Sequence, residues 1–257
     1  MKTPSYPDVQ VSLEENIATV EISAAPMNFL SVPLLEHLVS VWQWADKEPE
    51  CRVIILCTTG KIFSAGANFT DLMAGDDISP APLYKLARHL FEGNTPVIAA
   101  IQGAAVGAGL GLAMIADERV AGPKARFLAN FVQLGFHPGF ALTASLPHVI
   151  GAQRAAAMLM SARRISASEA LEIGLVDECA EEDELLDTTR ARAQAIARNA
   201  PVAVQDVRRT LRKPLVAAVA SAFEHELKMQ LEHFRTKDFG EGVSALFDKR
   251  EPQFTGS

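Results

Sequence analysis

Residues 95–111 read TPVIAAIQGAAVGAGLG and place a run of small residues directly after a short apolar segment. The apolar segment, Val97–Ile101, has the length and composition of a buried strand. Residues 61–69 (KIFSAGANF) repeat the arrangement after a second apolar run, Val53–Thr58. Small side chains at such turns allow a ligand to approach the backbone closely.

The two turns gain a chemical meaning if they lie together in the fold. Their backbone N–H groups would then point at one oxygen, and a buried helix starting near Gly109 would add its positive end. That arrangement describes an oxyanion hole for a thioester enolate. For either segment alone, close packing of a strand on a helix is the simpler interpretation, and the occurrence of both favours the ligand site.

The flanking sequence indicates an α/β protein. A third apolar run, Ile17–Ile22, predicts another buried strand, and a helical pattern at residues 34–42 follows Ser31 and Pro33 as start signals. The C-terminal third predicts helices separated by breaks at two prolines, Pro201 and Pro214. These helices are expected at residues 153–161, 167–173, 181–199 and 215–233.

The amino-acid composition limits the classes of protein to which the chain can belong. The 257 residues are 49% apolar and 21% charged, enough for one domain with a small appendage. The formal charge of −7, with the basic residues scattered, argues against nucleic-acid binding. The N-terminus lacks an apolar stretch, so we expect no membrane anchor and a cytoplasmic location. Cys51, Cys57 and Cys179 have no CxxC spacing, which predicts buried thiols and no metal site.

Two further sequence patterns bear on function. Glycines at 107, 109 and 111 do not form a dinucleotide-binding loop, because Leu112 stands where the third glycine of GxGxxG should be. Tyr84, in the segment 80–92, is interpreted either as part of the wall of a binding site or as part of a helical stripe that packs on the core.

At this point the sequence resembles the enoyl-CoA hydratase/isomerase, or crotonase, superfamily. Three segments in order carry the resemblance, and the chain end, at residues 241–243 and 249–252, is also similar to the family's C-terminus. These segments are FSAGANF (63–69), PVIAAIQG (96–103) and RISASEALEIGLVD (164–177).

The resemblance implies a fold and an assembly. The fold is a superhelix of ββα units over residues 1–164, followed by a helical region at 165–257 that forms trimers. Homotrimers or hexamers built from two trimers are expected. The implied ligand is an acyl-CoA substrate of fatty-acid metabolism, with coenzyme A as part of the substrate and no bound cofactor.

The resemblance also assigns site residues. The oxyanion-hole donors are the N–H groups of Ala67 and Ala108, the second at a position where glycine is usual. Lys249 is expected to reach a phosphate of coenzyme A bound to a neighbouring subunit. The other residues expected to contact substrate are Ala25, Met27, Ala65, Gly66, Asn68, Phe69, Gly107, Gly111, Asn130 and Phe131.

The chain departs from the family where hydratases carry their two glutamates. The first glutamate position is Gly111 and the second is Phe131, and the aspartate position of dienoyl isomerases is Gly139. A placed acid or base contributes roughly 10² to 10⁴ in rate, so efficient hydration of an enoyl-CoA is not expected. The resemblance still implies the nominal reaction of an enoyl-CoA hydratase/isomerase, which makes the enzyme class lyase or isomerase.

Two alternatives remain open. Residues 129–139 (ANFVQLGFHPG) are similar to decarboxylating members of the family, and decarboxylation of a β-carboxyacyl thioester needs no base. The second alternative is that the chain is a non-catalytic acyl-CoA-binding protein. His137 is the candidate replacement acid or base, because its ordinary pKa is near 6.5, although beside Pro138 it equally suits a turn cap.

Overall fold

The computed structural model describes residues 2–68 and 78–257. The strands are β1 (Val9–Glu14), β2 (Ile17–Ile22), β3 (Val53–Thr58), β4 (Ile62–Ser64), β5 (Val97–Ile101), β6 (Ala104–Val106), β7 (Glu118–Ala121), β8 (Arg126–Leu128), β9 (Ile165–Ser166) and β10 (Glu178–Cys179). The helices are α1 (Val32–Ala45), α3 (Ala81–Glu92), α4 (Ala108–Ala113), η1 (Phe131–Leu134), α5 (Leu142–Ile150), α6 (Ala152–Ser161), α7 (Ala167–Glu172), α8 (Leu185–Ala197), α9 (Pro201–His233) and α10 (Lys237–Asp248).

The described strands form two sheets, one of six strands and one of four. The larger has the order β1-β2-β3-β5-β7-β10 and is parallel except for the β1–β2 hairpin. Glu15 and Asn16 both have positive φ, as the tight turn of that hairpin requires. The smaller sheet has the order β4-β6-β8-β9.

Consecutive strands alternate between the sheets. β3 is followed by β4, β5 by β6, and β7 by β8, so each passage leaves the large sheet for the small one before the next helix. This is the repeated ββα path, and the α/β prediction is confirmed. β9 and β10 return to the two sheets from the C-terminal region.

Alternate residues of the large sheet enter two cores. In β3, Ile54 and Leu56 face the main core, which lies between the sheet and helices α1, α3 and α4. Val53, Ile55 and Cys57 point the other way, against a smaller cluster covered by α8. A strand buried on both faces reads as a continuous apolar run, as the sequence of β3 does.

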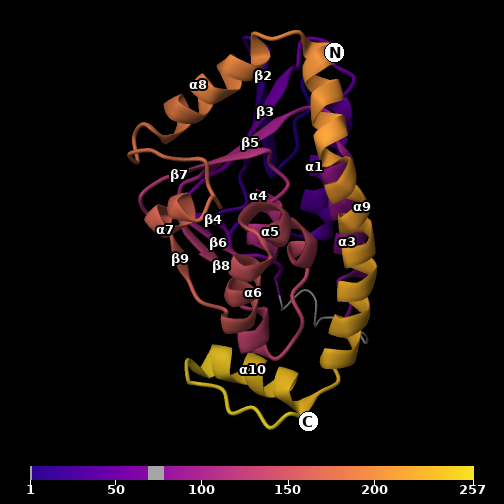
Figure 1. Ribbon diagram of the computed structural model, residues 1–257, viewed down its shortest axis with the longest axis vertical. Helices are drawn as coiled ribbons and strands as arrows, with labels where there is room; N and C mark the ends of the chain where they lie inside the picture. Colours follow the sequence, from indigo (N-terminus) through magenta and orange to yellow (C-terminus); the bar gives the residue numbers. More distant parts are fainter. Residues whose placement is uncertain (1, 69–77) are drawn as a thin grey trace.

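The C-terminal helices enclose the rest of the molecule on one side and at one end. In Figure 1, α9 runs along the side of the molecule and α10 crosses its lower end. α9 packs on α3 and α5, and α10 packs on η1. Helices of the last third therefore lie against elements formed by the middle of the chain.

Two expectations from the sequence are corrected. Pro214 does not break a helix but lies inside the single helix Pro201–His233, because this proline is exposed and its missing hydrogen bond lies on a surface where water can replace it. Cys179 is exposed, since β10 is a two-residue strand at the edge of the sheet, whereas Cys51 and Cys57 are buried as expected.

Candidate functional site

The first wall of the site is the turn after β4. Ser64 Oγ donates to the Asn28 carbonyl oxygen (2.8 Å) and accepts from the Gly66 N–H (3.2 Å). Gly66 has φ +90°, which glycine adopts without strain, and its carbonyl accepts from the Leu30 N–H (2.8 Å). These bonds fix the turn and leave the Ala67 N–H without an acceptor among the described residues.

The second wall is the start of α4. Gly107 has φ +55°, and its N–H donates to the Leu128 carbonyl (2.8 Å). The helix begins at Ala108, and N–H groups in a first turn have no partner within their helix. Within the part of the chain that the structure describes, no group accepts a hydrogen bond from the Ala108 N–H.

The two walls touch. A β-carbon added to Gly66 would lie 2.7 Å from the Val106 carbonyl oxygen and 3.3 Å from the Ala108 nitrogen. One added to Gly109 would lie 2.3 Å from the Ser64 carbonyl oxygen. The glycines therefore allow the two backbone segments that contain Ala67 and Ala108 to pack closely against each other.

A cavity of about 490 Å³ opens beside this meeting point. Its walls come from several segments between Met27 and Phe247, and most of the lining residues are aromatic or aliphatic. The described lining residues are Met27, Phe29, Ala65, Gly66, Ala67, Asn68, Pro80, Leu83, Tyr84, Val106, Gly107, Ala108, Asn130, Phe131, Leu134, Phe136, Phe140, Gln230, Phe234, Leu246 and Phe247.

Comparison with known proteins identifies this architecture. The enoyl-CoA hydratase/isomerase family matches residues 12–257. The chain belongs to that family. It is similar to a probable enoyl-CoA hydratase of Bacillus subtilis (strain 168), with 34% identity over 96% of this chain and 98% of the relative. It is 31% identical to the 2,3-dehydroadipyl-CoA hydratase of Escherichia coli (strain K12), over 96% of this chain and 98% of the relative.

A solved structure of the same family has the same fold. The enoyl-CoA hydratase/isomerase from Pseudoalteromonas atlantica T6c superimposes with a TM-score of 0.88 at 28% identity, over 96% of this chain and all of that one. Membership of the enoyl-CoA hydratase/isomerase family and the crotonase-type fold are thus established together.

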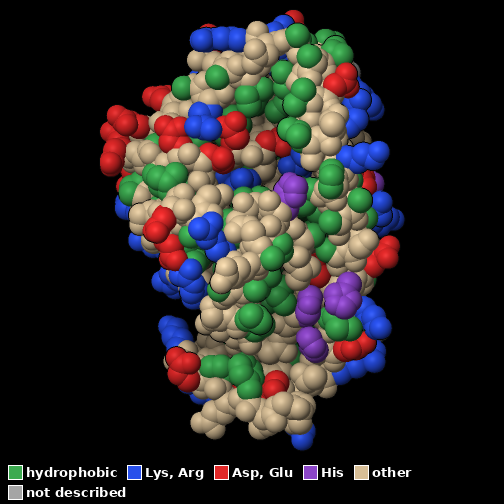
Figure 2. Space-filling model, viewed as in Figure 1, with side chains coloured by type: hydrophobic (Ala, Val, Ile, Leu, Met, Phe, Trp, Pro, Cys, Tyr) green, Lys and Arg blue, Asp and Glu red, His purple; other side chains and the backbone are tan. Residues whose placement is uncertain are grey.

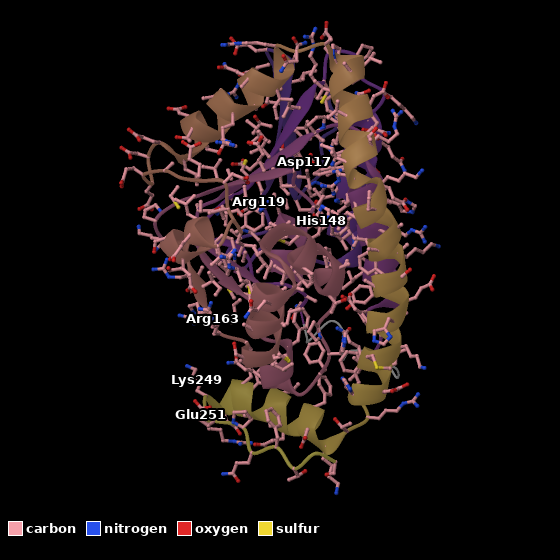
Figure 3. All side chains as sticks on the ribbon, in the orientation of Figure 1. Asp117, Arg119, His148, Arg163, Lys249 and Glu251 are labelled. Carbon is pink, nitrogen blue, oxygen red and sulfur yellow. The ribbon has the colours of Figure 1, made fainter. Side chains whose placement is uncertain are left out.

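Nine of the residues assigned to substrate or catalysis line the cavity, four described ones do not, and one lies outside the described residues. The nine are Met27, Ala65, Gly66, Ala67, Asn68, Gly107, Ala108, Asn130 and Phe131. Ala25 is exposed outside the lining, and Lys249 is exposed at the outer end of α10, beside Glu251 (Figure 3). Phe69 lies outside the described residues.

Gly111 does not line the cavity because Phe140 covers it. A β-carbon at position 111 would lie 2.5 Å from the Phe140 ring. At Gly139 a β-carbon would lie 1.8 Å from Tyr84 Oη. Side chains from elsewhere in the chain therefore fill the space at these two positions.

His137 does not face the cavity either, contrary to the expectation from its loop. Its backbone N–H donates to His233 Nδ1 (2.9 Å), and its own Nδ1 lies 2.7 Å from the Pro138 carbonyl. Its ring contacts those of His225 and His233 on α9, and Figure 2 shows a group of histidine side chains at the lower right of this face. Partial burial lowers the pKa of His137, and the two histidines lower it further. His137 thus caps the loop against α9.

The polar part of the described lining consists of Asn68, Tyr84, Asn130 and Gln230, and none of the described lining residues is Asp, Glu, His, Lys or Arg. Tyr84 had been noted in the sequence, but the contributions of Phe140, Gln230 and Phe247 were missed. No sequence signal marks Gln230 and Phe247, because the folding back of α9 and α10 brings them to the cavity, and Phe140 enters it from the loop before α5.

A buried carboxyl group holds α9 against the start of α5. Glu226 is fully buried and accepts from the Ala141 N–H (2.8 Å), the Thr143 N–H (3.0 Å) and Thr143 Oγ1 (2.6 Å). Burial raises the pKa of Glu226 to about 7, although the three donors oppose that shift. The bond network places Gln230, one turn further along α9, in the cavity wall.

Glu226 should make stability fall as pH rises. Because the pKa of this carboxyl is near 7 when folded and about 4.3 when unfolded, the folded state holds the proton more tightly. Its contribution is complete below about pH 4.3 and is lost as pH rises through 7. Between pH 5 and pH 8 we expect a loss of about 2 kcal/mol in the free energy of unfolding.

Denaturant unfolding at several pH values measures this slope. Glu226→Gln should remove most of it, whereas Glu224→Gln, an exposed position on the same helix, should keep it. An identical slope in wild type and Glu226→Gln would contradict the assignment.

Proposed function

We propose that this protein binds an acyl-CoA thioester and stabilises the enolate formed at its carbonyl through the N–H groups of Ala67 and Ala108. One observation carries the proposal: two N–H groups without acceptors among the described residues meet at the wall of a largely apolar cavity. The names of the relatives support coenzyme A as the carrier, since the two relatives described above are a probable enoyl-CoA hydratase and a 2,3-dehydroadipyl-CoA hydratase.

The chemistry follows from where charge develops. A thioester carbonyl gains negative charge on its oxygen as an enolate forms, and fixed N–H donors stabilise that charge most in a site with little water. The donors here are held by glycine turns and strand pairing. The cavity beside them, lined by Phe29, Phe131 and Phe136, suits an apolar acyl group.

The lining favours a reaction that needs no carboxylate base. The family reaction is hydration or isomerisation of an enoyl thioester, but the described lining holds no Asp, Glu or His side chain. A second candidate is decarboxylation of a β-carboxyacyl thioester. There the C–C bond to the carboxylate breaks, CO₂ leaves, and the bonding pair becomes the enolate that the two N–H groups stabilise.

A mass-spectrometric turnover screen tests the proposal. The purified protein is incubated with enoyl-, 3-hydroxyacyl- and β-carboxyacyl-CoA thioesters. A gain of 18 mass units from an enoyl thioester means hydration, and a loss of 44 from a β-carboxyacyl thioester means decarboxylation. Binding without any turnover supports a non-catalytic acyl-CoA-binding protein, and absence of binding overturns the proposal.

Ala67→Pro tests the first donor. Proline has no N–H, so turnover should fall by about 100-fold or more, the usual loss when one oxyanion-hole donor is removed. Ala67→Gly keeps the N–H and should retain most of the activity. Circular dichroism must show both variants folded, and equal activity in the two would exclude the Ala67 N–H from the reaction.

We also propose that the chain assembles into trimers or hexamers, as its family resemblance implies. Leu246 and Phe247 support this, since they are 51% and 66% exposed at the cavity wall, where a second copy would cover them. Mass photometry of the purified protein measures the assembly directly, and a monomer at micromolar concentration would exclude it.

A further inference from the structure

A pair of buried polar side chains lies in the otherwise apolar part of the cavity. Tyr84 on α3 donates a hydrogen bond from its hydroxyl to Gln230 Oε1 on α9 (2.8 Å). Tyr84 is 7% exposed and Gln230 is 2% exposed. Both line the cavity, among Leu83, Phe136 and Phe140.

The pair keeps hydrogen-bonding capacity that the protein does not use. Gln230 Nε2 carries two hydrogens, and one of them is donated to the His137 carbonyl oxygen (2.8 Å). The Tyr84 hydroxyl donates its single hydrogen to Gln230, and its oxygen can also accept a hydrogen bond. One N–H donor and one oxygen lone pair are left without a partner among the described residues.

Gly139 makes room for the pair. A β-carbon at this position would lie 1.8 Å from Tyr84 Oη and 2.5 Å from Gln230 Nε2. Phe140, the next residue, covers Gly111, one helical turn after the first residue of α4. The Tyr84–Gln230 pair and Ala108 line the same cavity.

The surroundings select an uncharged partner. Burial raises the pKa of Tyr84, and the negative charge of nearby Glu226 raises it further, so the phenol stays protonated at physiological pH. The pKa of Glu226 is about 7, and in its ionised form this group also repels a carboxylate in this part of the cavity. A hydroxyl group both accepts and donates, and it can therefore satisfy the free Gln230 N–H and the free Tyr84 lone pair together.

We propose that Tyr84 and Gln230 are specificity-determining residues that recognise a hydroxyl group on the acyl chain of the thioester. This inference rests on the proposed function and narrows it from acyl thioesters in general to hydroxyacyl thioesters. Buried polar groups that lack a partner are costly, so a ligand that completes the pair should be preferred over one that leaves it incomplete.

Isothermal titration calorimetry with matched ligands tests the proposal. The ligands are butyryl-CoA, both enantiomers of 3-hydroxybutyryl-CoA, 4-hydroxybutyryl-CoA and glutaryl-CoA, which ends in a carboxylate. We expect one hydroxyacyl thioester to bind about fivefold to tenfold more tightly than butyryl-CoA, the gain typical of hydrogen bonds between uncharged groups. Glutaryl-CoA should bind more weakly than that hydroxyacyl thioester.

Tyr84→Phe and Gln230→Leu should each reduce the preference to less than about twofold while butyryl-CoA still binds. Tyr6→Phe is the matched control, because the other tyrosine stacks on His37 outside the described cavity lining, and it should keep the wild-type preference. If butyryl-CoA binds as tightly as every hydroxyacyl thioester, or the preference survives in both variants, this inference is overturned while the proposed function stands. If no thioester binds to the wild type, the proposed function fails and the inference fails with it.

Discussion

Replacing Gly66 with alanine is expected to lower kcat/KM by about 100-fold or more for any thioester that the protein turns over. The added β-carbon would meet the Val106 carbonyl oxygen at 2.7 Å and the Ala108 nitrogen at 3.3 Å. The strand turn and the start of α4 would have to separate, and the proposed joint action of the Ala67 and Ala108 N–H groups on one oxygen would be lost. Steady-state kinetics on the substrate found in the turnover screen measures the loss.

Gly174→Ala separates this steric effect from backbone strain. Gly174 also has positive φ, at +76°, but no atom lies within 4 Å of an added β-carbon. The Gly174→Ala substitution should lower the free energy of unfolding by about 1 kcal/mol and leave kcat/KM unchanged within about twofold. If Gly66→Ala and Gly174→Ala lower activity equally, close approach of the two walls is not what the reaction requires.

Replacing Asp117 with alanine is expected to lower the free energy of unfolding by about 3 to 5 kcal/mol. Its carboxylate accepts from the Val97 N–H (2.8 Å), Arg208 Nε (2.7 Å) and Arg212 Nη1 (2.9 Å). Both arginines are more than nine-tenths buried, so removing their counter-ion leaves two charges in a site of low dielectric. Figure 3 shows Asp117 in the upper half of the molecule, near Arg119.

The melting temperature should fall by about 10 °C in that variant. Asp206→Ala is the control, since Asp206 pairs with Arg209 at the surface, where an ion pair contributes at most about 1 kcal/mol. Differential scanning calorimetry of the three proteins gives the comparison. Equal melting temperatures for Asp117→Ala and wild type would mean that the network does not anchor α9.

The sequence predicted the parts of the fold that short segments determine. Val97–Ile101 forms a strand because its apolar side chains can be buried on both faces, and the later turn contains Gly107, whose positive φ suits glycine. The two site loops could be predicted for the same reason, since each lies within a segment of about ten residues. The small sheet was missed, because its strands of two or three residues carry no periodicity.

The opposite wall of the cavity could not be predicted from local pattern. Gln230 and Phe247 enter the lining only because α9 and α10 fold back over η1 and α5. His137 was misplaced for a related reason: its ring turns toward His225 and His233, which are distant in sequence. Pro214 predicted a helix break that does not occur, because an exposed helix surface tolerates a missing N–H.

The wide spread of the cavity lining along the chain bears on synthesis in the cell. Both N–H groups proposed to hold the thioester oxygen belong to residues up to 108, whereas the last wall residue is Phe247, close to the end of the chain. A chain in which α10 has not yet folded would carry the two loops beside a cavity that lacks this wall and is open to water. Thioester chemistry would therefore begin only when α10 has docked.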